Sequence, residues 1–421
     1  MMSDDPRSIL TALFEAAIAA ADPERTIRNN LPAKPVGRTV VVGAGKGSAQ
    51  LARALEAEWD GQLDGVVVTR YGFGVQCQRI EIVEASHPVP DANGLVGAER
   101  LLAAVSGLTA DDLVIALISG GASALLPCPA AGLTLEDEIT VTTVLLASGA
   151  PISAMNAIRK QISAIKGGRL ALAAIPANVV SLIVSDVPGD DPAEVGSGPT
   201  VADATTRDEA LAAIRRYAIE LPDHIMAHIR DSGPTAPMPD DPRLAGHQYS
   251  VIASSSVSLE AAAEKARSLG YDAAILSDAV EGEAREASRM HAAIAREVAG
   301  RNRPFAKPVV LLSGGETTVT LRGGGKGGRN TEFMLSLAMD IDGVGGITAL
   351  AADTDGIDGS EHNAGAFADG NTIAAMRDIG LDPAALLADN DAWSAFDAID
   401  GLFSPGPTGT NVNDFRAILV R

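Results

Sequence analysis

Residues 308–332 read PVVLLSGGETTVTLRGGGKGGRNTE, a short apolar run that passes directly into a glycine-rich loop. The run 309–312 predicts a buried strand, and a second strand-like run covers 317–321. Small and polar residues directly after a buried strand are typical of ligand loops in α/β folds. The loop between the two runs therefore supplies four candidate binding residues: Ser313, Gly314, Gly315 and Glu316.

The second half of this stretch holds five glycines in the six positions 323–328, interrupted only by Lys326. Glycine lacks a Cβ and permits positive φ, so its main chain approaches a ligand closely. Arg329 and the helix-compatible run 331–338 follow, and a helix start adds unpaired N–H groups and a positive dipole. We favour a site for a phosphate or carboxylate. The alternative, a flexible hairpin tip, leaves Arg329 at the helix start unexplained.

The composition indicates an acidic α/β protein of several domains. A chain of 421 residues exceeds the usual size of one core, so we expect two or three domains. Apolar residues make up 46% and aromatic residues only 3%, which suits helices packed closely on a sheet. The net charge of −21 repels nucleic acid and anionic membranes, so we expect neither as a partner.

The sequence also bears on cellular location. Cys77 and Cys128 lie far apart, which excludes a disulfide framework and fits a reducing compartment. No uninterrupted apolar run reaches the ~18 residues of a membrane span, and the first residues do not resemble a signal peptide. We therefore expect a cytoplasmic protein, and the sequence leaves open whether it forms a homodimer.

A second glycine loop follows the apolar run 39–42 near the start of the chain. It resembles a Walker A loop but has Gly47 where Ser or Thr is needed, and it resembles a dinucleotide fingerprint but has Ser48 in place of the last glycine. Main-chain N–H groups, a helix start and the Lys46 ammonium still meet at one point. A structural turn is the alternative to a binding loop with Gly43, Gly45, Lys46 and Ser48.

Other predicted strands end in similar residues. The run 65–69 ends at Arg70, and the run 113–118 ends in Ser119, Gly120 and Gly121, which repeats the Ser-Gly-Gly of the opening stretch. His87 follows another strand and is interpreted equally well as a ligand contact or a packed loop residue. The helical pattern 134–170 carries Asn156 among several basic residues, either at a binding site or on a solvated face.

Aspartates follow two more predicted strands. Asp186 and Asp190 come after the run 178–184, and Asp353 comes after the run 347–351. Carboxylates at the carboxyl ends of buried strands are where metal ligands or a general base lie in open α/β sheets. Helix caps or turns are the alternative.

The best domain boundary is the segment 231–247, which holds four prolines and little apolar content. We expect an N-terminal domain over 1–235, a linker over 236–247 and a C-terminal domain over 248–421. Both are predicted to be three-layer α/β domains with mostly parallel sheets, separated by an active-site cleft.

Taken together, these stretches resemble the class II glycerate kinases, or glycerate 2-kinases, over nearly the whole chain. The number and order of the motifs make the resemblance specific, with Thr331 as a mild departure where the family often has Gln. The motifs are GAGKGS at 43–48, SHPVPDANG at 86–94, ISGGASALL at 118–126, SDVPGDD at 185–191, GSGPT at 196–200, LSGGETTV at 312–319, GGRNTE at 327–332, ADTDGIDG at 352–359 and TGTNVND at 408–414.

The resemblance implies a Rossmann-like N-terminal domain, a C-terminal MOFRL domain and transfer of the γ-phosphoryl group of ATP to the 2-hydroxyl of D-glycerate with Mg²⁺. It also implies that Lys46, Asp186 and Arg329 occupy the functional positions of the family. Some relatives carry the name hydroxypyruvate reductase, which is associated with tartrate and glyoxylate metabolism.

In phosphoryl transfer the protein mainly positions the reactants and neutralises the negative charge of the phosphoryl group. We assign Lys46 and Arg329 to the transferring phosphoryl group and the glycerate carboxylate. We assign Asp186 as a general base or Mg²⁺ ligand, with Asp190 or Asp353 as a second ligand. We expect Arg329 to reach into a wet cleft and to contribute little to folding.

Two other functions compete with this one. An NAD(P)H-dependent hydroxypyruvate reductase is opposed by Lys46 and Ser48, which break the nicotinamide fingerprint. A non-catalytic sensor of sugar acids or nucleotides would share the fold without turnover.

Overall fold

The structure, a computed structural model, describes residues 5–232 and 236–421, which form two compact units. The N-terminal unit begins at Pro23 and ends at Ile252, and the C-terminal unit combines the described part of the first 22 residues with Ala253–Arg421. These units differ from the expected boundaries at both ends. The first helix joins the C-terminal unit, and the division follows residue 252 rather than the segment 236–247.

Packing explains both differences. Helix α1 (Pro6–Ala20) buries Leu10 and Phe14 in the core of the C-terminal unit, where the Phe14 ring meets Phe403 edge-on at 5.0 Å. The segment 236–247 is attached to the N-terminal unit, because the Val179 N–H donates to His247 Nδ1 at 2.9 Å.

The N-terminal unit is built on a six-stranded sheet with the order β3-β2-β1-β4-β5-β6, and β1 to β5 run parallel to one another. The predicted runs 39–42 and 113–118 are the central strands β1 and β4. The strands are β1 (Thr39–Ala44), β2 (Asp64–Arg70), β3 (Ile80–Ala85), β4 (Leu113–Ser119), β5 (Asn178–Val184) and β6 (Gln248–Ala253).

Both faces of this sheet are buried, so its strands are apolar throughout. Val40 and Val42 of β1 pack into a cluster with α4 (Ala92–Ala104), whereas Val41 between them packs against α3 (Ser48–Glu58) on the other face. Period-two alternation along the strand therefore produces two apolar layers instead of one apolar and one polar face.

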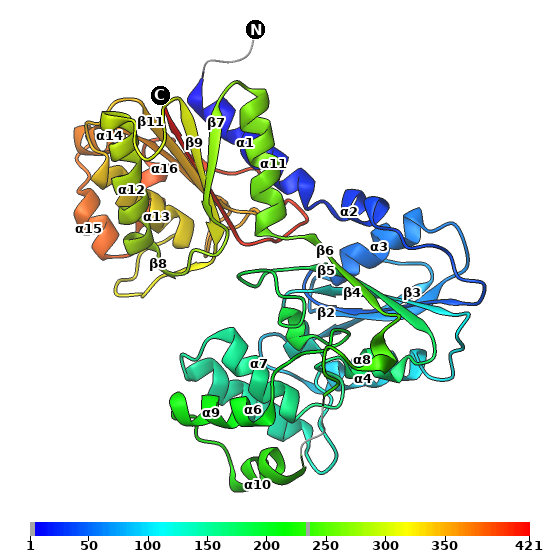
Figure 1. Cartoon of the computed structure of the whole chain (residues 1–421). Coiled ribbons are helices and arrows are strands. Elements are labelled where there is room, and N and C mark those ends of the chain that lie inside the picture. Colours follow the sequence, from blue (N-terminus) through cyan, green and yellow to red (C-terminus); the bar gives the residue numbers. More distant parts are fainter. Residues whose placement is uncertain (1–4, 233–235) are drawn as a thin grey trace. The chain divides into compact units, whose positions relative to one another are not determined.

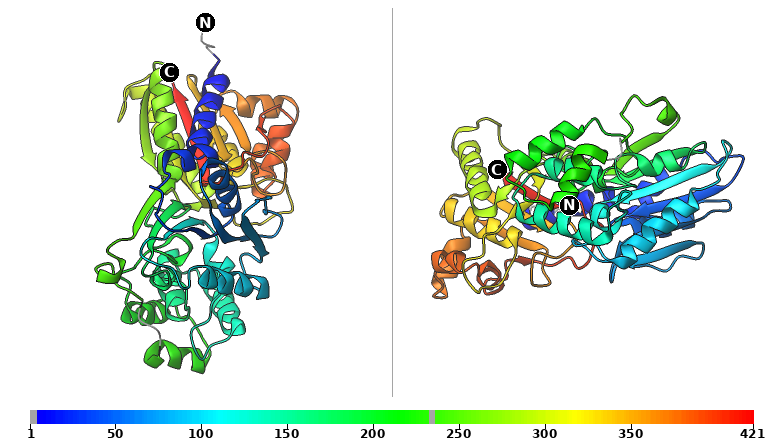
Figure 2. Two further views of the ribbon diagram at one scale, coloured as in Figure 1. Left: turned by 90° about the vertical axis from the view of Figure 1, so that its right-hand side faces the viewer. Right: turned by 90° about the horizontal axis from the view of Figure 1, so that it is seen from below.

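A helical group made of α6 (Leu135–Ala147), α7 (Ile152–Gln161), α9 (Arg207–Arg216) and α10 (Asp223–Ala227) has its own core, with Val141, Ile158, Ile214 and Ile225 among its buried residues. In Figures 1 and 2 these helices, coloured teal to green, form a bundle beside the sheet. The helices of the N-terminal unit not yet named are α2 (Pro23–Asn29), α5 (Ala122–Leu125) and α8 (Arg169–Ala173), with short turns at Val195–Ser197, His228–Ser232 and Pro242–Leu244.

The C-terminal unit contains a second six-stranded sheet with the order β13-β12-β11-β14-β9-β7. Its neighbouring strands run antiparallel except for the parallel pair β7–β9, and the last strand lies between β9 and β11. The strands are β7 (Asp272–Ser277), β9 (Val309–Gly315), β11 (Ile347–Asp353), β12 (Gly365–Asp369), β13 (Leu402–Phe403) and β14 (Asp414–Val420), and β8 (Gly282–Glu283) pairs separately with β10 (Thr317–Thr318).

Helices cover both faces of this sheet (Figure 1). Val310 and Leu312 of β9 pack toward α1 and α11, whereas Val309 and Leu311 pack toward α12 and α13. The predicted α/β class is thus confirmed for the chain. The prediction of a mostly parallel sheet holds for the N-terminal unit and is wrong for this sheet, where four of the five strand pairs are antiparallel. The helices are α11 (Ser255–Ser268), α12 (Ala284–Arg301), α13 (Arg329–Asp340), α14 (Thr372–Asp378), α15 (Pro383–Ala388) and α16 (Ala392–Asp397).

No helix among the described residues is both long enough and apolar enough to cross a bilayer.

Candidate functional site

The carboxyl ends of β1, β4 and β5 bring three predicted loops to one edge of the N-terminal sheet. The Lys46 N–H donates to the Gly120 carbonyl oxygen at 2.8 Å, and the Gly47 N–H donates to Ser119 Oγ at 3.0 Å. Asp186 follows β5 and lies against Gly120. We call this group of Lys46, Gly120, Gly121 and Asp186 the Lys46 edge.

A hydrogen bond between the side chains of Ser48 and Ser119 connects two of these loops. Their hydroxyl oxygens lie 3.0 Å apart, and both residues are buried. Gly45 has a φ of +139° and passes so close to β4 that a Cβ there would lie 2.5 Å from the Ser119 carbonyl oxygen. A Cβ on Gly43 would meet the Leu117 carbonyl oxygen at 2.4 Å. The structure thus gives these four predicted binding residues a packing role, and their contact with a ligand stays a prediction.

Gly120 and Gly121 give the Lys46 edge its open shape. A Cβ on Gly120 would lie 1.8 Å from Asp186 Oδ2. Gly121 has a φ of +84°, and a Cβ there would meet the His87 ring at 3.1 Å and Lys46 Cγ at 3.2 Å. The two glycines therefore let a carboxylate, an ammonium-bearing side chain and an imidazole surround one short piece of main chain.

Gly120→Ala is expected to lower turnover by at least about 10²-fold, because the new methyl group must displace Asp186, and a shift of about 1 Å costs that much. Steady-state kinetics and circular dichroism on the same protein check this. Gly300→Ala is the matched control, since a Cβ at Gly300 in α12 meets nothing within 4 Å. Normal turnover in Gly120→Ala would show that catalysis does not depend on the position of Asp186.

Three cationic side chains surround His87. Burial, together with the smaller effect of the charges of Lys46, Arg70 and Arg159, lowers the pKa of His87 to about 4. His87 is therefore neutral at pH 7, and the positive charge here comes from the lysine and the arginines. Burial lowers the pKa of Arg159 to about 10, which still leaves it charged. The sequence left the role of His87 open and gave no specific signal for Arg159.

Arg70 and Asn156 differ in how they are held. The Arg70 guanidinium stacks 3.5 Å from the centre of the Phe73 ring. Asn156 is 1% exposed, and its amide nitrogen donates to Glu194 Oε2 at 2.7 Å while its Oδ1 accepts from Ser197 Oγ at 2.8 Å. Since Arg159 Nη1 also donates to this Oδ1 at 3.3 Å, Asn156 is placed to orient Arg159. Its predicted ligand contact stays untested.

Two carboxylates in one loop of the N-terminal unit are candidate metal ligands. Asp186 lies at the Lys46 edge, and Asp190 follows in the same loop with a φ of +55°. Within residues 5–232 and 236–421, no three His, Cys, Asp or Glu side chains are grouped closely enough to hold a metal by themselves. Mg²⁺, however, is commonly held by one or two carboxylates together with substrate phosphates and water.

In the C-terminal unit, Arg329 lies among carboxylates at the end of β9 and β11. Its Nε donates to Asp414 Oδ1 at 2.7 Å and its Nη2 to Asp353 Oδ2 at 2.6 Å, while Nη1 lies 3.6 Å from Glu316. Arg416 completes the group by donating to Asp414 from a fully buried position. We call these five residues the Arg329 cluster.

The Arg329 cluster pairs two guanidinium groups with three carboxylates. Burial lowers the pKa of the Arg329 guanidinium, but Asp414, Asp353 and Glu316 outweigh burial and raise that pKa above its ordinary value. Burial raises the pKa of Asp353 well above its ordinary value, against the charge of Arg329. Its Oδ1 accepts from the Asp355 N–H at 3.0 Å and its Oδ2 from Arg329, which favours a role in holding Arg329 over metal ligation.

The expectation that Arg329 contributes little to folding is therefore not supported. Its side chain is only 25% exposed and compensates two carboxylates that are 6% and 0% exposed. Breaking a buried pair by removing one partner typically costs about 3–5 kcal/mol.

The loop Ser313-Gly314-Gly315 is enclosed by neighbouring segments. Ser313 Oγ lies 2.9 Å from His291 Nε2, and a Cβ on Gly314 would lie 2.0 Å from Ser255 Oγ. Gly315 has a φ of +113°, and a Cβ there would lie 2.2 Å from the Val280 nitrogen. These contacts explain the two glycines by packing, and the predicted ligand contacts of this loop stay untested.

The glycine run after β10 also has a packing explanation. Its N–H groups donate to the segment 389–391: Gly323 to Asn390 Oδ1 at 3.1 Å and Lys326 to Asp391 Oδ1 at 2.9 Å. A Cβ on Gly325 would lie 2.4 Å from Asp391 Cβ.

The start of α13 does hold an anion, but that anion belongs to the protein. Asp358 accepts from the Asn330 N–H at 2.9 Å and from the Thr331 N–H at 2.8 Å, and it is 1% exposed. Two of the N–H groups that the sequence offers to a ligand, those of Asn330 and Thr331, are thus already used by Asp358. Neither Asp358 nor Asp414 was expected from the sequence as a partner of this stretch.

Two family models match this chain. The domain of unknown function DUF4147 matches residues 9–230, which is the larger part of the chain, and the MOFRL family matches residues 309–414. The chain belongs to this DUF4147–MOFRL family. The family resemblance inferred from the motifs is thereby confirmed.

Relatives of this DUF4147–MOFRL protein carry two kinds of name. A putative hydroxypyruvate reductase of Agrobacterium vitis is 54% identical over 98% of this chain and 94% of its own length. A glycerate 2-kinase of Pyrococcus horikoshii is 40% identical over 100% of this chain and 98% of its own. The crystal structure of a glycerate kinase from Thermotoga maritima superposes with a TM-score of 0.89 at 36% identity, covering 99% of this chain and 100% of that one.

Proposed function

We propose that this DUF4147–MOFRL protein is a glycerate 2-kinase, which transfers the γ-phosphoryl group of ATP to the 2-hydroxyl of D-glycerate. The observation that carries the proposal is the Lys46 edge. An ammonium side chain, a carboxylate and a neutral imidazole surround Gly120 and Gly121 where three parallel strands end. Full-length relatives named as glycerate 2-kinases supply the substrate class.

Each proposed role follows from charge and position. Lys46 stabilises negative charge on the transferring phosphoryl group, since fixed charges in a preorganised site are the main requirement of phosphoryl transfer. Within the described residues its ammonium group has no ion pair or hydrogen bond of its own. Arg329 binds an anionic group of a substrate through Nη1, while Asp353 and Asp414 hold its other nitrogens. Asp186 accepts the proton of the 2-hydroxyl as general base.

The residues at the Lys46 edge also fit Mg²⁺. Asp186 and Asp190 would hold the ion together with nucleotide phosphates and water, as Mg²⁺ sites commonly do. Bound Mg²⁺ would neutralise phosphate charge. Asp353, the third predicted ligand, fits less well because both of its oxygens have partners in the protein.

The competing function is the NAD(P)H-dependent hydroxypyruvate reductase, and the name of the Agrobacterium vitis relative favours it. The nicotinamide fingerprint needs glycine where this chain has Ser48, which is buried and bonded to Ser119. The presence of Lys46 in the turn suits phosphate charge rather than hydride transfer.

We expect ADP release that depends on D-glycerate, and no NADH or NADPH oxidation with hydroxypyruvate. Both assays are run on one enzyme preparation with Mg²⁺, and with EDTA as the control for the ion. Reductase turnover without kinase turnover would establish the competing function, and absence of both would favour a sensor.

We also propose a cytoplasmic location, where ATP is abundant and the free thiols of Cys77 and Cys128 stay reduced. A homodimer is the proposed assembly, and sedimentation velocity at several concentrations tests it.

A further inference from the structure

A cavity of about 390 Å³ opens at the amino edge of the N-terminal sheet. Its lining includes Thr39 and Asp64, the first residues of β1 and β2, whereas Lys46 lies beyond the last residue of β1. At about 3.3 Å per residue, β1 separates the two ends by roughly 17 Å. The cavity is therefore distinct from the Lys46 edge.

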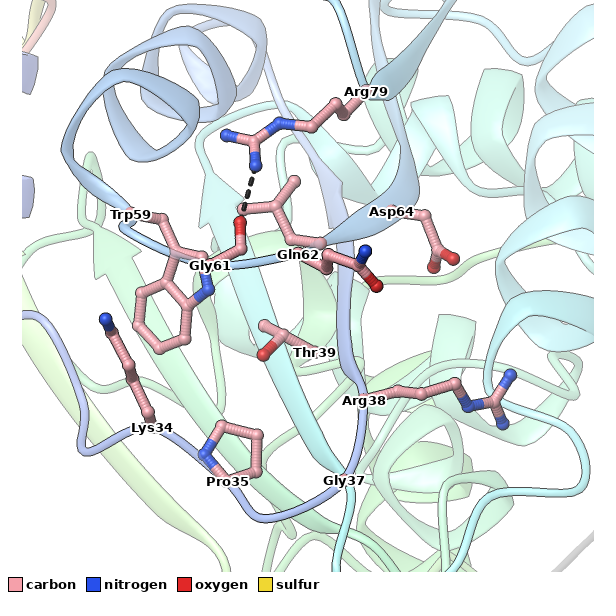
Figure 3. Close-up of a pocket in the computed structure, with 11 residues that line it drawn as sticks. Lys34, Pro35, Gly37, Arg38, Thr39, Trp59, Gly61, Gln62, Asp64 and Arg79 are labelled. Carbon is pink, nitrogen blue, oxygen red and sulfur yellow. Dashed lines mark hydrogen bonds between the residues drawn. The ribbon is translucent and has the colours of Figure 1, made fainter.

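Two buried polar side chains reach this cavity without a partner. Thr39 and Trp59 are each 5% exposed, and both line the cavity (Figure 3). Among the described residues, neither the Thr39 hydroxyl nor the Trp59 indole N–H makes a hydrogen bond to protein. Neither polar atom belongs to the fully buried, unpartnered atoms of the described residues, so both can be reached from the cavity and can donate to the oxygen atoms of a ligand.

Positive charge surrounds the same cavity. Lys34, Arg38 and Arg79 line it with a single carboxylate, Asp64, although the chain as a whole carries a net charge of −21. Each cation also lies near a carboxylate outside the lining: Asp60 beside Lys34, Asp112 beside Arg38 and Glu56 beside Arg79.

The three cations differ in how firmly they are held. Arg79 is fixed, because its Nη1 donates to the Gly61 carbonyl oxygen at 2.6 Å (dashed line in Figure 3) and its Nη2 to the Glu56 carbonyl oxygen at 2.8 Å. It thereby holds the loop that carries Trp59.

Lys34 and Arg38 are held much more weakly. Lys34 lies 3.0 Å from Asp60, whose side chain is fully exposed, and Arg38 lies 3.9 Å from Asp112. The side chains of Lys34 and Arg38 are 54% and 61% exposed, and the Arg38 guanidinium lies beyond hydrogen-bond distance of the buried Asp112, so both cations can turn toward a ligand.

We propose that this cavity is a second anion site, which binds a small dianion with phosphoryl or carboxylate oxygens. Lys34 and Arg38 supply the charge, and Thr39 and Trp59 donate hydrogen bonds to the bound oxygens. The volume lies in the ordinary range of small-ligand pockets, about 300–1,000 Å³.

Trp59 also provides the measurement, because the chain has only two tryptophans. In a Trp393→Phe background the emission reports Trp59 alone. The protein is titrated with inorganic phosphate and, separately, with malonate, at constant ionic strength set by KCl. A saturable change in emission is expected with at least one anion. A response to phosphate alone identifies phosphoryl ligands, and a response to malonate alone identifies dicarboxylates.

Variants locate the anion. Lys34→Gln/Arg38→Gln in the same background is expected to raise the Kd by about tenfold or more, since it removes two charge-assisted contacts. Arg289→Gln/Arg301→Gln changes the net charge equally at exposed positions of α12 and is expected to leave the Kd unchanged. Lys46→Ala is also expected to leave it unchanged.

Three results would overturn the proposal. The first is the absence of a saturable change with both anions. The second is an unchanged Kd in Lys34→Gln/Arg38→Gln with a native circular dichroism spectrum. The third is loss of binding in Lys46→Ala, which would place the anion at the Lys46 edge instead.

Discussion

Lys46→Ala is expected to lower the kcat of glycerate phosphorylation by about 10²–10³-fold, the usual effect of removing one charge-stabilising donor from a preorganised site. The lysine lies in a loop whose backbone is fixed by other groups: the Lys46 N–H is bound to Gly120 and the Gly47 N–H to Ser119. The fold should therefore survive the loss of the side chain, and the Tm should change little.

Stopped assays of ADP formation and thermal melting on the same preparation check this expectation. Lys265→Ala is the control, because it removes a lysine from α11 in the other unit. A Lys46→Ala enzyme with near-normal kcat would reduce the loop 43–48 to a structural turn.

Arg329→Ala is expected to lose both activity and stability. Its removal leaves Asp353 and Asp414 buried without their partner, at a cost of about 3 kcal/mol or more. For a domain of this size, about 2–4 °C per kcal/mol converts this into a Tm lower by roughly 6–12 °C. Arg329→Lys should retain part of the stability, because the charge remains. It should still be much less active, because lysine lacks the planar fork that makes parallel hydrogen bonds.

A double variant separates the two effects. Arg329→Ala/Asp353→Asn should regain part of the lost Tm, because one uncompensated carboxylate is gone, while kcat stays low. Kinetics and melting of all three variants are measured together. Full activity in Arg329→Ala would assign Arg329 to structure alone, and an unchanged Tm would contradict the ion pairing described for the Arg329 cluster.

The sequence predicted the strands of both sheets well where burial on two faces makes them apolar throughout. The run 309–312 lies within β9, and the run 113–118 lies within β4. The prediction of a strand over 317–321 was less accurate, since only Thr317–Thr318 pairs as a strand. The convergence of Lys46, Gly120 and Asp186 also followed from the sequence, because parallel strands place their carboxyl ends at one edge.

Contacts between distant segments could not be predicted in this way. β14 inserts between β9 and β11, and local periodicity carries no information about strand order. Asp414 and Arg329 are 85 residues apart, so the ion pair that holds Arg329 left no local signal. The glycines 323–328 suggested a ligand, and contact with one stays a prediction. The structure explains Gly323 and Gly325 by packing, because a Cβ on either would meet the segment 389–391.

The central claim is that the 2-hydroxyl of D-glycerate receives the phosphoryl group. The most direct measurement incubates the enzyme with ATP, Mg²⁺ and D-glycerate, removes it by filtration, and adds enolase alone while absorbance follows phosphoenolpyruvate. We predict immediate conversion, because 2-phosphoglycerate is the substrate of enolase. Conversion only after addition of phosphoglycerate mutase would show that the 3-hydroxyl was phosphorylated and would contradict the account.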